Sequence, residues 1–113
     1  MVTTEALKNF GADTDEGITR CAGKEELYLK LVGRIREDAG FSDIKDALEK
    51  KDLDRAFESA HKLKGALANL SLGPLLDPVD RITESLRHRE DRDYSSDLAE
   101  MEVKKKEFDA LFA

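Results

Sequence analysis

Residues that cross-link or interrupt a chain are scarce in this sequence, which has one cysteine, two prolines and no tryptophan among 113 residues. Cys21 has no partner for an internal disulfide, and one cysteine with two histidines leaves too few ligands for a structural zinc site. We interpret Cys21 as a small apolar residue. No apolar run approaches the roughly 18 residues of a membrane helix, and there is no signal-peptide pattern. We therefore expect a soluble, cytoplasmic protein, and the net charge of −6 argues against an anionic membrane as a partner.

Motifs for nucleotide binding and hydrolysis are also missing. The sequence has no glycine-rich phosphate loop, no Walker lysine, no acidic cluster for Mg²⁺ and no serine–histidine–acid set. Its net charge of −6 argues against nucleic acid as a partner. We therefore predict a protein without a cofactor or a metal, which is not an enzyme with an ATP-binding or kinase site of its own.

The composition that remains, 39% charged and 40% hydrophobic residues, is typical of a small helical protein with solvated outer faces. The length is sufficient for one core without disulfides, so we expect a single domain over residues 1–113. We predict an all-α fold, an antiparallel up-down four-helix bundle over about residues 24–112. Short N-terminal helices over about residues 3–20 are expected to pack on the bundle, because they are too short to be stable alone.

Capping residues and glycines predict where the longer helices begin and end. We expect one helix from Lys24 to Ala39, which Gly40 ends or bends. Its inward-facing residues are predicted to be Leu27, Leu31 and Ile35 with neighbouring Tyr28 and Val32. Ser42 then caps a short helix to about residue 51, and Asp52 caps the helix after it. The helix after Gly73 has two possible starts, either at Pro74 or after an Asp77 cap with Pro78 as its first residue. The last helix is predicted over 94–111.

The helix that follows Asp52 carries the most informative motif. At about 100° per residue its apolar residues form one stripe, and this stripe consists of Leu53, Ala56, Ala60, Leu63, Leu67 and Leu70. His61 lies roughly 120° from the centre of the stripe. We therefore expect its imidazole to be accessible to solvent, where a neutral nitrogen can attack an electrophile.

Two residues near His61 favour a reactive site over an ordinary surface histidine, which is the alternative interpretation. Gly65 lies one turn after His61, although glycine costs a helix interior roughly 1 kcal/mol relative to alanine. A helix that only faces solvent gains nothing from it, so we infer that a large partner docks there. Lys64 falls between the stripe and His61, where its ammonium can reach an anionic product.

The run His61-Lys62-Leu63-Lys64-Gly65, followed by Asn69-Leu70, resembles the signature of histidine-containing phosphotransfer (HPt) domains. The resemblance extends to Asp15-Glu16-Gly17-Ile18, to Gly23-Lys24-Glu25-Glu26-Leu27-Tyr28 and to Gly73-Pro74-Leu75, and so covers nearly the whole chain. One departure is Ser71, which stands where the family usually has glycine. This departure concerns the end of the helix and not the chemistry.

The resemblance implies a phosphocarrier of multistep His–Asp phosphorelays. His61 would accept a phosphoryl group through Nε2 from a receiver aspartyl phosphate, Lys64 would offset its charge, and the group would pass to a second receiver. The implied partners are response-regulator receiver domains and a hybrid histidine kinase. The chain is expected to bind them as a monomer. The residues expected to contact a partner are Lys62, Gly65, Ala68, Asn69 and, with a role in orienting the imidazole, Thr83.

Two other functions are compatible with the same sequence. The chain could be a helical adaptor or docking domain without phosphoryl chemistry. It could also be the phosphotransfer domain excised from a larger histidine kinase, although such kinases continue into dimerisation and ATP-binding domains and this sequence ends at Ala113. A metal-dependent enzyme ranks below both, because ligands are missing.

Overall fold

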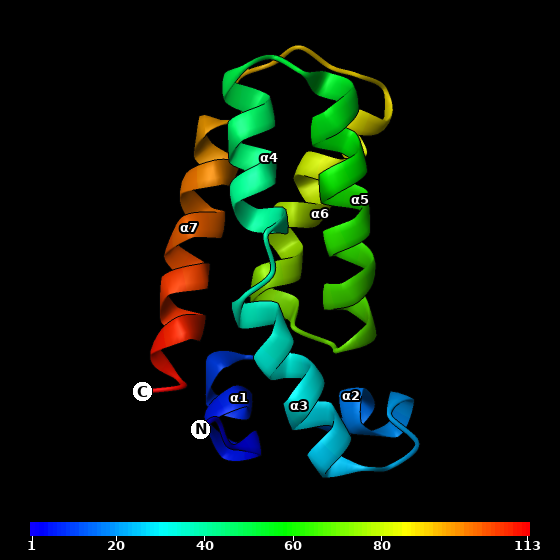
Figure 1. Cartoon of the computed structure of the whole chain (residues 1–113), viewed down its shortest axis with the longest axis vertical. Helices are drawn as coiled ribbons and strands as arrows, with labels where there is room; N and C mark the ends of the chain where they lie inside the picture. Colours follow the sequence, from blue (N-terminus) through cyan, green and yellow to red (C-terminus); the bar gives the residue numbers. More distant parts are fainter.

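A computed structural model describes residues 1–113 and contains seven helices and no strand (Figure 1). The all-α prediction is therefore confirmed. The helices are α1 (Thr4–Phe10), α2 (Thr14–Arg20), α3 (Glu25–Arg36), α4 (Gly40–Glu49), α5 (Leu53–Asn69), α6 (Gly73–Arg87) and α7 (Ser95–Ala110).

The four helices from α4 to α7 lie alongside one another, and the chain direction alternates from each to the next (Figure 1). Helix α5 packs between α4 and α6, and α6 packs against α7. Helices α1, α2 and α3 gather at the end of this group where α5 ends and α6 begins (Figure 1). There α3 packs against α2 and α7, and the Met1 ammonium donates to the Phe112 carbonyl at 3.2 Å.

The stripe predicted for the histidine helix forms the buried face of α5. Ala56, Ala60 and Leu67 have no solvent exposure, and Leu63 is 2% exposed. They belong to one hydrophobic core with side chains of α1, α3, α4, α6 and α7, and Cys21 joins it as a small apolar residue. None of the seven helices combines the length and the apolar character needed to cross a membrane.

The expected helix over residues 24–39 is shorter than predicted. Helix α3 ends at Arg36, and Gly40 begins α4 instead of ending α3. The Asp38 carboxylate accepts a hydrogen bond from the Gly40 N–H at 2.7 Å, which supports the new helix start. Ser42 is therefore inside α4 and is not its cap, and its hydroxyl donates to the Ala39 carbonyl at 3.0 Å.

The prediction that Leu27 faces inward is wrong. The buried residues of α3 are Tyr28, Val32 and Ile35, which recur at helical spacing. Leu27 lies roughly 100° from the centre of that stripe, and it is 40% exposed. The rotation of α3 is set by its buried tyrosine and not by its leucines.

Side-chain caps begin three of the helices. Asp52 caps α5 by accepting from the Arg55 N–H at 3.1 Å, as predicted. Thr3 and Asp13 cap α1 and α2 in the same way. Helix α6 begins at Gly73 with Pro74 in its first turn, so Asp77 is not its cap and Pro78 lies inside it.

Candidate functional site

His61 occupies the exposed side of α5, opposite the buried stripe. Helix α5 forms because Asp52 satisfies its first turn and its apolar residues recur at helical spacing. Burial of Ala60 and Leu63 against neighbouring helices turns His61 outward, and its side chain is exposed. The imidazole can therefore meet a reactant from solvent without any rearrangement of the fold.

An aromatic ring one turn before His61 lies against the imidazole. The ring centroids of Phe57 and His61 are 5.5 Å apart, and the two planes differ by 24°. Two guanidinium groups lie over the Phe57 ring, Arg89 at 4.5 Å and Arg87 at 5.6 Å from its centroid. Arg89 is held in turn by Asp54, whose carboxylate accepts from its Nε at 2.7 Å. The imidazole is thus bordered on this side by an aromatic surface with two cations.

Sequence reasoning missed this contact. A phenylalanine four residues before a histidine on one helix is a usable signal, because side chains at this spacing are neighbours on the helix surface. The positions of Arg87 and Arg89 carry no such signal, since these residues reach Phe57 from the end of another helix.

The ammonium of Lys64 is held by α6. Its Nζ lies 2.7 Å from Asp80 Oδ1 and 3.0 Å from Glu84 Oε2. The hydrogen bond to Asp80, and to a smaller extent the one to Glu84, raises the pKa of Lys64. Glu84 also accepts from Arg87 at 3.1 Å, and hydrogen bonds from Arg87 and then Lys64 lower the pKa of Glu84 to about 2. These shifts favour the charged forms of Lys64 and Glu84 at neutral pH.

The acidic partners of Lys64 were not predicted. Asp80, Glu84 and Arg87 recur at helical spacing on α6, which indicates one charged row but not which helix the row faces. That depends on the packing of α5 against α6, which no local pattern gives.

The surface around Gly65 is open. A Cβ added to Gly65 would have no atom within 4 Å outside its own helix backbone and adjacent residues. Lys62 and Asn69 are exposed, and Ala68 is partly exposed. Lys62 also borders a recess of about 440 Å³ between α5 and residues 38–43. These four residues therefore lie on accessible surface of the helix that carries His61.

Thr83 does not lie on this surface. Its side chain is fully buried, and its hydroxyl donates to the Val79 carbonyl at 2.7 Å. The hydroxyl proton is therefore not available to the imidazole, and a partner cannot touch the residue. The expectation that Thr83 orients His61 or contacts a partner is wrong, because Thr83 lies on the inward side of α6.

Residues of the N-terminal segment close the C-terminal end of α5. Arg20 Nη1 donates to the Ala68 carbonyl at 2.7 Å, and the Tyr28 hydroxyl donates to the Leu70 carbonyl at 2.9 Å. The Ala68 carbonyl also accepts from the Ser71 N–H at 3.1 Å, so Arg20 adds a second bond there. The Leu70 carbonyl follows the last turn of the helix, where carbonyls lack helical partners, and the Tyr28 hydroxyl satisfies it. Ser71 adopts the left-handed conformation with φ of 55°, and this ends α5 where glycine would be usual.

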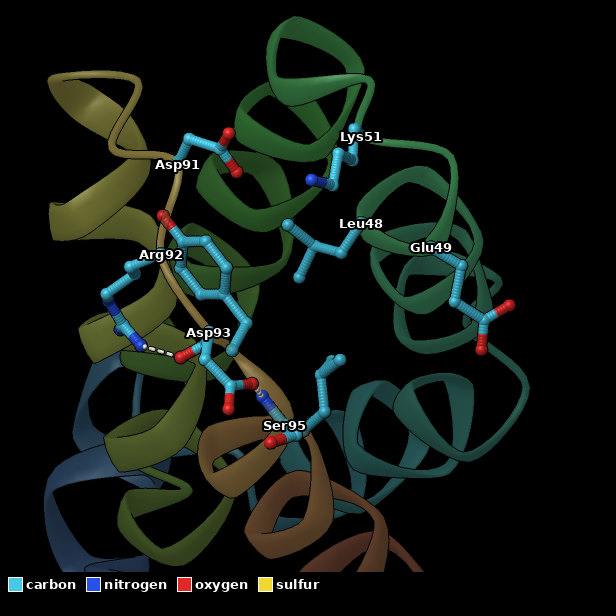
Figure 2. Close-up of a pocket in the computed structure, with 9 residues that line it drawn as sticks. Leu48, Glu49, Lys51, Asp91, Arg92, Asp93 and Ser95 are labelled. Carbon is cyan, nitrogen blue, oxygen red and sulfur yellow. Dashed lines mark hydrogen bonds between the residues drawn. The ribbon is translucent and has the colours of Figure 1, made fainter.

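A second hollow, of about 500 Å³, lies near the start of α7 and contains none of the predicted site residues (Figure 2). Two hydrogen bonds join its polar groups to one another, and Arg92 also donates to Ser85 and Asp97 outside it. Asp93 accepts from the Ser95 N–H at 2.9 Å, and Arg92 donates to the Asp93 carbonyl at 2.8 Å (Figure 2). These bonds support the first turn of α7, so we assign this hollow a structural role. No group of three or more His, Cys, Asp or Glu side chains is arranged to hold a metal ion.

Comparison with known families agrees with the resemblance of the motif. The model of the Hpt domain family matches residues 27–113, which include α4 to α7 and His61. Comparisons with curated proteins and with solved structures give no match. Hpt domains are phosphocarriers of His–Asp phosphorelays and interact with receiver domains and kinases. Since the match covers well over half of the sequence, this chain belongs to the Hpt domain family.

Proposed function

We propose that this chain is a phosphocarrier that accepts a phosphoryl group on His61 from a receiver aspartyl phosphate and passes it to a second receiver. The observation that carries the proposal is the exposed His61 on α5, with Gly65 one turn away and open space above it. Membership of the Hpt domain family supports the same chemistry.

The proposed reaction is an in-line displacement at phosphorus. A neutral imidazole nitrogen, Nε2 by analogy with the family, forms an N–P bond while the bond between phosphorus and the aspartate oxygen breaks. The receiver carboxylate leaves with the electron pair, and the other imidazole nitrogen keeps its proton. Phosphoryl transfer depends mainly on positioning and on neutralising charge. In this scheme the receiver supplies the metal ion, and the chain supplies the nucleophile and the Lys64 ammonium.

We propose that receivers dock on the accessible surface formed by Lys62, Gly65, Ala68 and Asn69. The openness at Gly65 supports this, because a glycine there lets a partner approach the backbone of α5. In this proposal α4 to α7 act as the antiparallel four-helix bundle that presents His61. We also propose that residues 1–113 act as one domain, which the bonds from Arg20 and Tyr28 to the end of α5 support, and that the chain meets its partners as a monomer.

The test is direct labelling of His61. A panel of receiver domains is phosphorylated with acetyl phosphate and incubated with the wild-type chain, with His61→Gln and with His88→Gln. His88 is a matched control, because it is also exposed but lies beyond the end of α6. We expect acid-labile phosphate on the wild type and on His88→Gln and none on His61→Gln. Undiminished label on His61→Gln would contradict the proposal, and no label on any variant would favour an adaptor without phosphoryl chemistry.

A further inference from the structure

The side chain proposed to meet the phosphoryl group already has two anionic partners. The Lys64 ammonium lies within 3.0 Å of both Asp80 Oδ1 and Glu84 Oε2, and the side chain is 29% exposed. Lys64 and His61 are three residues apart on α5, a spacing that brings their Cβ atoms within about 5–6 Å of each other. The lysine side chain is long enough to reach His61 from this position, but its ammonium is directed toward α6.

A phosphoryl group on His61 would compete with these carboxylates for the ammonium. Phosphorylated side chains carry a charge of about −1.5 to −2 and strong acceptor oxygens, so they attract a nearby lysine. The existing ion pairs are partly exposed, with Asp80 46% and Glu84 50% accessible, and ion pairs of this kind are weak. Lys64 can therefore leave α6 at a small cost when a stronger anion arrives.

The two carboxylates are not equivalent. Glu84 keeps a second cation, Arg87, at 3.1 Å when Lys64 moves. Asp80 has no other ion pair, and Arg87 interacts with it only at longer range, so Asp80 loses its one close cation. Most of the ion-pair energy lost when Lys64 is released is therefore lost at Asp80.

We propose that Asp80 is a positioning residue that holds Lys64 on α6 while His61 is unphosphorylated, and that it thereby shifts the phosphoryl equilibrium toward the receiver aspartate. The inference rests on the proposed function of His61. Asp80 exchanges no proton and forms no covalent bond in this scheme. It stabilises the unphosphorylated state through Lys64, so that the phosphorylated state is reached only when Lys64 is released.

The experiment measures the equilibrium distribution of phosphate between one receiver and this chain. Asp80→Asn is compared with Asp77→Asn, which removes the same charge from an exposed residue of α6 that forms no ion pair. Each substitution is made in the wild type and in Lys64→Ala. The equilibrium constant depends on the free proteins in each phosphorylation state, so changes in docking strength do not alter it. Thermal unfolding confirms that each variant folds.

We expect Asp80→Asn to shift the equilibrium toward phosphorylated His61 by about two- to fivefold, the range of an exposed ion pair. The shift should disappear when Asp80→Asn is made in Lys64→Ala, and Asp77→Asn should give a smaller shift. Asp80→Glu, which keeps a carboxylate at this position, should leave the equilibrium as in the wild type. A shift of equal size in Lys64→Ala would mean that Asp80 acts by simple repulsion, and no shift at all would mean that it does not hold Lys64. Either result would overturn the role of Asp80 and leave the proposed function of His61 intact. Wild-type protein that takes no phosphate on His61, even from phosphoramidate, would overturn the proposed function as well.

Discussion

Gly17 in α2 and Gly65 in α5 are both glycines inside helices, and their surroundings are opposite. Gly17 is buried, and a Cβ placed on it would collide with the Tyr28 ring and lie 2.9 Å from the Leu70 carbonyl oxygen. Gly65 is exposed, and a Cβ placed on it would meet no neighbouring element. Only the first glycine is explained by the packing of this chain.

The difference separates two regions of α5. Its C-terminal end is closed, because Arg20, Tyr28 and the Gly17 backbone pack over its last carbonyls. Its outer face, with His61 and Gly65, is open. A glycine in the open region weakens α5 without any compensating contact within the chain. Gly33 in α3 is equally open, so it is the position of Gly65 one turn from His61 that supports the proposed docking of a partner. The comparison therefore shows that Gly65, unlike Gly17, has no packing role within the chain.

The largest effect that tests this comparison is expected at Gly17. Gly17→Ala would force Tyr28 away from the Leu70 carbonyl, and overpacking of this kind typically costs about 1–3 kcal/mol. We expect the free energy of unfolding to fall by that amount in denaturant titrations. Gly33→Ala is the matched control, because Gly33 is also inside a helix but a Cβ added to it would have no neighbouring atom within 4 Å. Equal stability of the two variants would show that Gly17 is not a packing glycine.

A smaller effect of opposite sign is expected at Gly65. Gly65→Ala should raise the free energy of unfolding by up to about 1 kcal/mol, because alanine is the better helix former and the site has room for it. Chemical denaturation of the variant and the wild type under one condition measures the difference. If Gly65→Ala unfolds more easily, the open region is not open in solution.

Gly65→Gln extends this prediction from stability to function. The bulky side chain should leave the melting temperature equal or higher while phosphotransfer from a receiver slows. Phosphorylation of His61 by phosphoramidate, which needs no docking surface, should change much less. A parallel loss with both donors would show that Gly65 serves the geometry of His61 and not the approach of a partner.

The features that local patterns could predict are those set within one helix. Asp52 as a cap and the buried stripe through Ala60 and Leu67 follow from spacing alone, and the structure confirms them. The break before Gly40 was misplaced, because a glycine can end one helix or begin the next, and the Asp38 side chain decides between them here. The exposure of Leu27 was missed, because the burial of Tyr28 against the end of α5 sets the rotation of α3.

The candidate site was predictable only in part for the same reason. The outward position of His61 and the accessibility of Gly65 follow from the angle each makes with the buried stripe. The pairing of Lys64 with Asp80 depends on how α5 and α6 are aligned, and so does the burial of Thr83. The register between α5 and α6 is fixed by their packing and by the connection at Ser71. The periodicity of residues within one helix cannot predict this register.

The smallest effect is expected at Ser71, in the closed region. Ser71 adopts a φ of 55°, a left-handed conformation that is unfavourable for residues with a Cβ. Glycine removes that strain but adds freedom to the unfolded chain, and the two terms largely cancel, so we expect Ser71→Gly to raise the free energy of unfolding by at most about 0.5 kcal/mol. Ser71→Ala is the control, because it keeps the Cβ and should give no gain. If alanine stabilises as much as glycine, the backbone at Ser71 is not strained, and the end of α5 gains nothing from a glycine there.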